Sequence, residues 1–218
     1  MDSIKLERRI LSRNDVLAGD LRDRFRARGV AVLNMVSSPG SGKTSLLERT
    51  LGGLSEEMRI GVIEGDIQTE NDARRIARTG VPVRQIQTGG ACHLEAAMIA
   101  EALKSLQWED LDLLVIENVG NLVCPSAFDL GEGARVVLIS TTEGDDKPLK
   151  YPAMFHSAHL MVVNKIDLLP YTDFSVDTAV ENARSLNPDV KVLRTSCRTG
   201  EGLEVWNDWV RSFVKSRD

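Results

Sequence analysis

The feature that most constrains the fold is the run SSPGSGKT at residues 37–44, which lies between an apolar segment and a helix-length segment. In this setting Gly40 and Gly42 let successive backbone N–H groups point inward and hold an anion at a helix N-terminus. Lys43 is placed to neutralise β- and γ-phosphates, and the Thr44 hydroxyl to ligate magnesium. The run therefore predicts a P-loop. Its predicted nucleotide-binding residues are Ser38, Pro39, Gly40, Ser41, Gly42, Lys43, Thr44 and Ser45.

Short apolar segments recur along the rest of the chain, with helix-length segments between most of them. They lie at residues 30–36, 59–65, 82–86, 111–117, 134–140, 159–165 and 190–196. Apolar strands that alternate with helices predict a largely parallel sheet covered on both faces. We therefore expect an α/β, three-layer P-loop NTPase fold with about seven strands. Trp206 and Trp209, at helical spacing in the last predicted helix, are expected to be core anchors.

Residues 1–28 are charged and amphipathic, with apolar residues at about four-residue spacing. We expect them to form an N-terminal helical arm that packs on a P-loop domain formed by residues 29–218. Ser12, with Asp15 three residues later, has the pattern of a cap for a second helix within the arm.

Composition excludes several classes of protein. The 218-residue chain is 42% hydrophobic and 27% charged, and its net charge of -5 gives no general attraction to nucleic acid or to anionic membranes. It has neither an apolar run of membrane-spanning length nor an apolar signal-peptide core. Three cysteines, an odd number, argue against a disulfide scaffold. We expect a cytoplasmic protein with reduced thiols.

The tetrapeptide NKID at residues 164–167 predicts which base is bound. Asp167 can accept from the N1–H and the exocyclic amine of guanine, a donor pair that adenine does not present on that edge. Asn164 can pair with the O6/N7 edge, while the Lys165 stem covers one face of the ring.

The loop TSCRTGEG at residues 195–202 strengthens this prediction. It resembles the second base-contacting element of GTPases, and Ser196 and Cys197 are its predicted contact residues. Cys197 stands where alanine is usual. A guanine site is favoured over an ATP site or a solvated loop.

Carboxylates at two predicted strand ends are candidates for magnesium binding and hydrolysis. Asp66 follows the second strand, and Glu117 begins ENVG, which resembles the D-x-x-G element of GTPases with glutamate for aspartate. Gly120 closes that element and can bring its N–H to the γ-phosphate. The predicted catalytic residues are Lys43, Thr44, Asp66 and Glu117, of which the last three are the expected magnesium ligands. Helix capping or surface exposure is the alternative for the two acids.

The stretch QTGGACHLEAAM at residues 87–98 places Cys92 beside His93 at the predicted start of a helix, and Cys124 follows Gly120 by four residues. Thiolate and imidazole suit nickel or zinc. Neighbouring helical residues point about 100° apart, so both reach one ion only if the helix start is distorted. Three ligands leave a tetrahedral shell open for a water, a small ligand or a second subunit. Equally open is that the cysteines are small buried hydrophobes and His93 a helix-terminal polar residue.

Together with GDIQTENDA, TGGACHLEA, ENVGNLVCP and GDDKPLKYP, these motifs resemble the HypB family of hydrogenase nickel-incorporation GTPases, in order across nearly the whole chain. The resemblance implies a GTP-binding and GTP-hydrolysing metallochaperone that dimerises with nucleotide and helps load nickel into [NiFe] hydrogenase. It implies a metal site at Cys92, His93 and Cys124. The implied partners are the hydrogenase large subunit and a small nickel-binding maturation protein, with no nucleic acid or membrane.

Two features separate the chain from related patterns. The urease accessory GTPases carry a C-P-H element that is replaced here by CH and NLVCP. Many bacterial members have an N-terminal histidine-rich stretch or cysteine-rich nickel site that this chain lacks, so nickel storage is not expected. The alternatives are a urease-type nickel-insertion GTPase, an ATP-dependent kinase, and a nucleotide-gated metal-binding module with incidental hydrolysis.

We expect the nucleotide and metal sites to share one moving segment. Glu117 and Gly120 face magnesium and γ-phosphate, and Cys124 follows them, so GTP binding is expected to alter metal affinity or dimerisation. Intrinsic hydrolysis is expected to be slow, because no catalytic glutamine or arginine finger is evident. Lys147 or Lys150 either reaches nucleotide across a dimer or is a solvated surface lysine.

Overall fold

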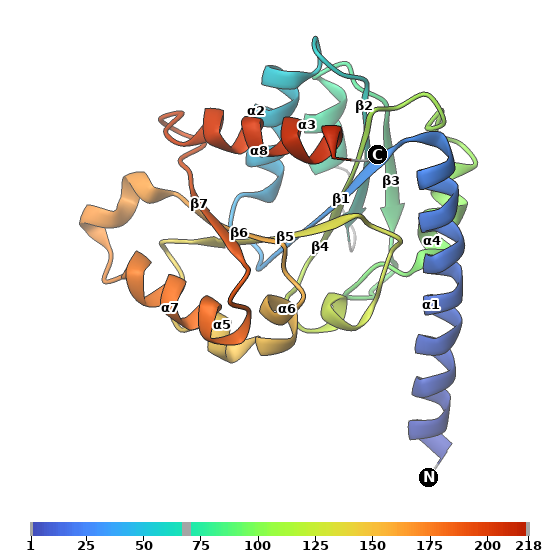
Figure 1. Cartoon of the computed structure of the whole chain (residues 1–218), viewed down its shortest axis with the longest axis horizontal. Coiled ribbons are helices and arrows are strands. Elements are labelled where there is room, and N and C mark those ends of the chain that lie inside the picture. Colours follow the sequence, from blue (N-terminus) through green and yellow to red (C-terminus); the bar gives the residue numbers. More distant parts are fainter. Residues whose placement is uncertain (1, 67–70, 217–218) are drawn as a thin grey trace.

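In the computed structural model, which describes residues 2–66 and 71–216, seven strands form one sheet in the order β3-β2-β4-β1-β5-β6-β7 (Figure 1). All pairings are parallel. The strands are β1 (Ala31–Ser37), β2 (Ile60–Asp66), β3 (Val83–Gln87), β4 (Leu113–Gly120), β5 (Ala134–Ser140), β6 (Leu160–Asn164) and β7 (Lys191–Arg194). The predicted fold class is confirmed, with strand ends within three residues of those expected.

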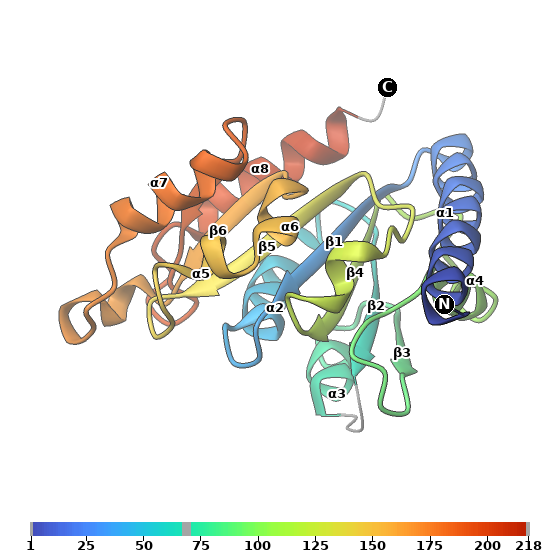
Figure 2. The ribbon, with the colours of Figure 1, turned by 90° about the horizontal axis from the view of Figure 1, so that it is seen from below.

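Helices cover both faces of the sheet (Figures 1 and 2). They are α1 (Asp2–Arg28), α2 (Lys43–Leu54), α3 (Asn71–Ala77), α4 (Ala96–Leu103), α5 (Lys147–Lys150), α6 (Pro152–His156), α7 (Val176–Leu186) and α8 (Leu203–Lys215), with 3-10 turns η1 (Cys124–Ala127) and η2 (Ile166–Tyr171). Among the described helices, none is both long and apolar enough to span a membrane.

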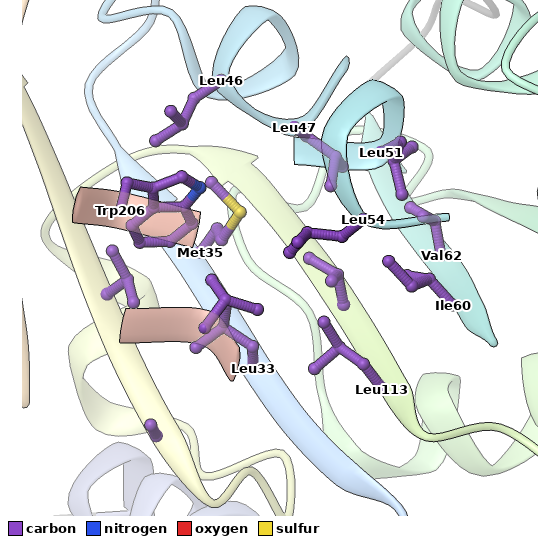
Figure 3. Packing of buried hydrophobic residues seen from close by; sticks show 14 of the residues in the cluster. Leu33, Met35, Leu46, Leu47, Leu51, Leu54, Ile60, Val62, Leu113 and Trp206 are labelled. Carbon is purple, nitrogen blue, oxygen red and sulfur yellow. The ribbon is translucent and has the colours of Figure 1, made fainter. Parts of the chain in front are cut away.

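Side chains that alternate along the central strands point into separate apolar cores on the two faces of the sheet. Leu33 and Met35 of β1 pack beneath α2 and α8, where Trp206 is fully buried (Figure 3). The Trp206 indole N–H donates to the Thr50 hydroxyl at 2.7 Å, which satisfies its buried donor. Val32 faces the opposite core, under α1 and α4. Trp206 is thus a core anchor, as expected. Trp209, which was also expected to be one, is only partly buried.

The N-terminal segment is one continuous helix, which fits the expected helical arm, and the alternative of a second helix capped by Ser12 is not found. Buried residues recur every three or four positions at Asn14, Ala18, Leu21 and Phe25. One face therefore packs without interruption, and nothing favours a break at Ser12. Figure 1 shows α1 and α4 side by side, with the first turns of α1 extending away from the sheet.

Candidate nucleotide and metal sites

The predicted P-loop joins β1 to the start of α2. Gly40 and Gly42 have positive φ values of 75° and 99°, and a Cβ at Gly42 would lie 2.5 Å from the Asn164 amide nitrogen. No side chain caps the first turn of α2, and no acid lies there, as an anion-binding helix N-terminus requires. The Lys43 ammonium donates to the Ser37 hydroxyl at 3.1 Å. Ser37, where a glycine is usual, thus holds the lysine over the loop.

A charged pair covers the same loop from the segment after β5. The Lys147 ammonium donates to the Ser38 hydroxyl at 2.7 Å and pairs with Glu143 at 3.0 Å. The other Glu143 oxygen accepts from the Ser41 hydroxyl at 2.7 Å. Burial raises the pKa of Glu143, but hydrogen bonds from Ser41 and Lys147 outweigh it and lower that pKa overall. Lys147 therefore touches the P-loop of its own chain, whereas Lys150 forms an exposed pair with Asp146.

Acidic residues converge on the start of α2. Glu117, only 3% exposed, accepts from the Thr44 hydroxyl at 2.7 Å, and its Oε2 has no hydrogen-bond partner. Glu64, which the motif search missed, lies beside Glu117 in register and also has an unpartnered Oε2. Asp66 is half-buried at the end of β2. Oxygen ligands beside a P-loop threonine fit magnesium, and the orphaned carboxylate oxygens indicate that a cation belongs there.

Burial sets the charge of this acidic group. Burial, and then the charge of Glu117, raises the pKa of Glu64 to about 8. Burial likewise raises the pKa of Glu117, against the opposing charge of Lys43. The two carboxylates cannot both ionise cheaply without a nearby cation. Among the predicted loop residues, Ser45 is half-buried and its hydroxyl accepts from Arg75 at 3.1 Å.

The NKID segment lies against the P-loop. Asn164 donates to the Ser41 carbonyl at 2.9 Å and accepts from the Thr195 hydroxyl at 3.2 Å. Lys165 has a positive φ of 61° and donates to the Gly40 carbonyl at 2.7 Å. Asn164 therefore ties the phosphate loop to the predicted base loop, a role that the motif does not reveal.

Asp167 of the NKID segment is oriented by a hydrogen bond from the base loop. Its Oδ1 accepts from the Ser196 hydroxyl at 2.6 Å. The Cys197 thiol faces the Asn164 oxygen at 3.5 Å, and burial raises its pKa, so the thiol stays neutral. The structure thus brings together the side chains predicted to contact the base.

Cys92, His93 and Cys124 form a cluster whose ligand atoms all lie within 4.8 Å of one another. The Cys92 and Cys124 sulfurs are 2.7 Å apart, and the Cys92 sulfur is 3.9 Å from His93 Nδ1. The hydrogen bond with Cys124 is the main cause that raises the pKa of the Cys92 thiol. Soft sulfur with imidazole nitrogen suits nickel or zinc better than magnesium.

The prediction that Cys92 begins a helix is wrong, because α4 begins at Ala96. Gly89 and Gly90 have positive φ values of 62° and 109°, and they form a turn that delays the helix. Cys92 and His93 therefore lie in irregular backbone, where neighbouring side chains are not held about 100° apart. This removes the geometric objection to their binding one ion.

The His93 ring is held by stacking and lies near a carboxylate. It stacks on Phe128 with ring centroids 3.9 Å apart. Its Nδ1 faces Cys92, and its Nε2, which has no hydrogen-bond partner among the described residues, lies 3.6 Å from a Glu95 oxygen. A carboxylate that hydrogen-bonds the second nitrogen of a ligating histidine orients the ring, and Glu95 is the residue near enough to do so. Glu95 was also missed from the sequence, where the i+2 spacing to His93 carries no periodic signal.

Residues 31–194 match the family model described as "CobW/HypB/UreG, nucleotide-binding domain". The hydrogenase maturation factor HypB of Azotobacter vinelandii is 55% identical over 95% of this chain and 68% of that protein. The chain belongs to the HypB family.

Solved HypB structures agree with this assignment. The crystal structure of HypB from Helicobacter pylori in complex with nickel has a TM-score of 0.89 and 40% identity, covering 93% of this chain and 95% of that one. HypB from Archaeoglobus fulgidus has a TM-score of 0.87 and 41% identity, covering 93% of this chain and 99% of that one. These HypB relatives thus resemble this chain in both sequence and fold.

Proposed function

We propose that this HypB-family chain is a GTP-hydrolysing metallochaperone that helps insert nickel into [NiFe] hydrogenase. The observation that carries the proposal is the Cys92, His93 and Cys124 cluster directly beyond the strand that bears Glu117 and Gly120. The similarity to hydrogenase maturation factors, and to a relative crystallised with nickel, supports nickel as the cargo. Zinc suits the same ligand set and is the competing ion.

The nucleotide-binding site promotes hydrolysis by positioning the nucleotide and neutralising the charge of its phosphates. The loop at residues 38–42 cradles phosphates, Lys43 balances their charge, and Asp167 selects guanine. Thr44, Glu117 and Asp66 hold magnesium, which when bound neutralises charge on the phosphates. Water is the nucleophile, and intrinsic turnover is slow because the sequence shows no catalytic glutamine or arginine finger.

The metal-binding cluster is suited to a protein that carries an ion and then releases it. The three clustered ligands leave a tetrahedral shell incomplete. In a nucleotide-dependent homodimer the second copy can complete that shell, and hydrolysis then reopens it. A small nickel-binding partner supplies the ion in the cytoplasm, and the hydrogenase large subunit receives it. Residues 29–218 form the GTPase domain and residues 1–28 its arm.

The test is a Ni²⁺ titration of wild type and Cys92→Ala, with and without magnesium and a non-hydrolysable GTP analogue, read by mass on a sizing column. Wild type is expected to bind Ni²⁺ and to dimerise with the GTP analogue, while an ATP analogue has no effect. Cys92→Ala should lose more than the roughly 10- to 100-fold in affinity that removing a supporting residue costs. Glu101→Gln, on the exposed side of α4 and outside both sites, is the control. Equal Ni²⁺ binding by wild type and Cys92→Ala would overturn the metal assignment.

A further inference from the structure

Asn121 joins the two segments that carry the metal ligands. Its Nδ2 donates to the Cys92 carbonyl at 3.1 Å, and its Oδ1 accepts from the Val123 N–H at 2.9 Å. Val123 precedes Cys124, so a single amide side chain spans both cysteine segments. Both of its polar atoms are engaged, and a change in its position must therefore be felt by one segment or the other.

Asn121 also follows directly on the part of β4 that touches the P-loop. A Cβ on Gly120 would lie 3.3 Å from backbone atoms of Pro39, and Gly120 pairs in register with Ser37. The Asn121 N–H donates to the Val119 carbonyl at 2.7 Å, which makes a tight turn immediately after Gly120. A displacement of Gly120 when phosphate fills the loop therefore moves Asn121 with it.

The Cys92 segment is anchored elsewhere, so it does not simply follow Asn121. Leu94 is fully buried against Gly65 of β2, where an added Cβ would lie 2.8 Å from its Cδ1. The Ala96 N–H donates to the buried Asn14 side chain at 2.8 Å. Val123, by contrast, is 60% exposed. The Cys92 segment is thus fixed to the body of the fold beside its ligands, whereas the Cys124 segment is tied to α1 beyond its turn, at Asp129, and the exposed turn itself can shift.

We infer that Asn121 is the positioning residue through which nucleotide at the P-loop sets the distance between Cys92 and Cys124, and hence the affinity for metal. The inference deepens the proposed function and rests on it. Asn121 is not itself a metal ligand and does not touch nucleotide in this mechanism, although its amide also lies against the Cys92 thiol. It transmits a shift at Gly120 through two hydrogen bonds to the backbone on either side of the metal cluster.

The test compares the Ni²⁺ affinity of the full chain with and without magnesium and the non-hydrolysable GTP analogue, in wild type, Asn121→Asp and Ser126→Ala. Asn121→Asp keeps the acceptor for Val123 but removes the donor to the Cys92 carbonyl. Ser126→Ala is the matched control. The Ser126 hydroxyl donates to the Val123 carbonyl at 2.7 Å, but this bond does not involve Cys92. Asn121→Ser, which introduces no charge, separates any direct effect of the new carboxylate on Ni²⁺ from the loss of the link.

Wild type and Ser126→Ala are expected to show a nucleotide-dependent change in Ni²⁺ affinity within the roughly 5- to 150-fold range of such couplings. In Asn121→Asp that ratio should fall to unity, and Ni²⁺ should cease to change affinity for the GTP analogue, because coupling is reciprocal. A residue with a merely structural role would lower both affinities and leave the ratio unchanged. Asn121→Ser, too short to span both segments, must give the same result if Asn121→Asp fails to fold.

Two results would overturn the inference and are distinguishable. A wild-type ratio retained in both Asn121 variants would exclude Asn121 as the link and leave the proposed function intact. A ratio of unity in wild type itself would remove the coupling from the proposed function and the inference with it.

Discussion

Glu64 and Glu117 are buried carboxylates on neighbouring strands, and each carries an oxygen without a hydrogen-bond partner. Such an arrangement costs folding free energy, because ionised carboxylates lose hydration without gaining partners. Natural sequences retain such costs mainly at functional positions. The acids are therefore best understood as part of the proposed nucleotide site, in which a bound magnesium ion would supply the missing positive charge.

This cost predicts how the stability of the metal-free protein depends on pH. The pKa of Glu64 rises from its ordinary value of 4.5 to about 8 on folding. Between these two values the folded protein holds a proton that the unfolded chain has released, so the free energy of unfolding falls as pH rises. At about 1.4 kcal/mol per pKa unit, the loss amounts to a few kcal/mol and is complete above about pH 8.

Glu64→Gln should flatten this dependence. Urea unfolding in a chelator is expected to show wild type less stable at pH 8 than at pH 5, and the variant with a smaller difference. Glu101→Gln, on the exposed side of α4, is the control and should behave as wild type does. An unchanged slope in Glu64→Gln would mean that Glu64 ionises normally in the fold.

Single residues also show where motif reasoning ends. The P-loop and NKID were predictable, because each depends on residue types at short spacings. Spacing alone left Cys92, His93 and Cys124 open between a metal site and buried hydrophobes, and the resemblance to the HypB family implied the metal site. Glu64, Glu143 and Asn121 were not predictable, since their roles arise from strand register or from contacts between segments distant in sequence. No local pattern distinguishes them from other polar residues.

Among the elements, α1 is part of the scaffold of the metal site and does more than cover the sheet. Asn14, 4% exposed, accepts from the Ala96 N–H and donates to the Asp129 carbonyl, each at 2.8 Å. The Arg22 Nη2 donates to both oxygens of the Asp129 carboxylate, at 2.7 and 2.6 Å. Ala96 begins the helix after Cys92 and His93, and Asp129 follows the turn that contains Cys124. The arm therefore fastens both metal-bearing segments from outside.

Asn14→Ala is expected to weaken Ni²⁺ binding by a similar factor with and without nucleotide. It leaves a buried N–H and a carbonyl without partners, at about 1–3 kcal/mol each, and loosens both ligand segments together. Affinity for the GTP analogue alone should stay at the wild-type value, since Asn14 touches no P-loop residue. Asp15→Ala, at the exposed neighbouring position, is the control. Calorimetric titration of both variants with Ni²⁺ measures the effect, and unaltered Ni²⁺ affinity in Asn14→Ala would exclude a role for the arm.

Elements were predictable where burial imposes a pattern. The strands are apolar on both sides, because helices cover both faces, and this made their positions clear. The start of α4 was misplaced because the apolar residues that follow Cys92 continue the helical pattern, whereas Gly89 and Gly90 set a turn. The helical arm at residues 1–28 was predictable from its apolar spacing, and the cap pattern at Ser12 does not interrupt the helix, because the buried face continues through it.

At the scale of the whole molecule, strand order explains why the sites are neighbours. The sheet places β4 between β2 and β1, so the ends of strands bearing Asp66, Glu117 and the P-loop meet at one edge. Ligands of parallel α/β sheets bind at that edge. Parallel strands and the position of the P-loop followed from the sequence. The order of the strands did not, because it depends on packing between distant segments.

This shared edge predicts that nucleotide and metal stabilise the whole fold non-additively. A ligand present at 100 times its Kd adds about 2.7 kcal/mol, and each kcal/mol raises the Tm of a chain of this size by about 2–4 °C. If the sites are coupled, the stabilisation with both ligands differs from the sum of the separate stabilisations by the coupling free energy, about 1–3 kcal/mol. Thermal unfolding with Mg²⁺ and the GTP analogue, with Ni²⁺, and with all together measures this difference. The ATP analogue should give no shift, and strictly additive free energies would show that the two sites act independently despite lying at one edge.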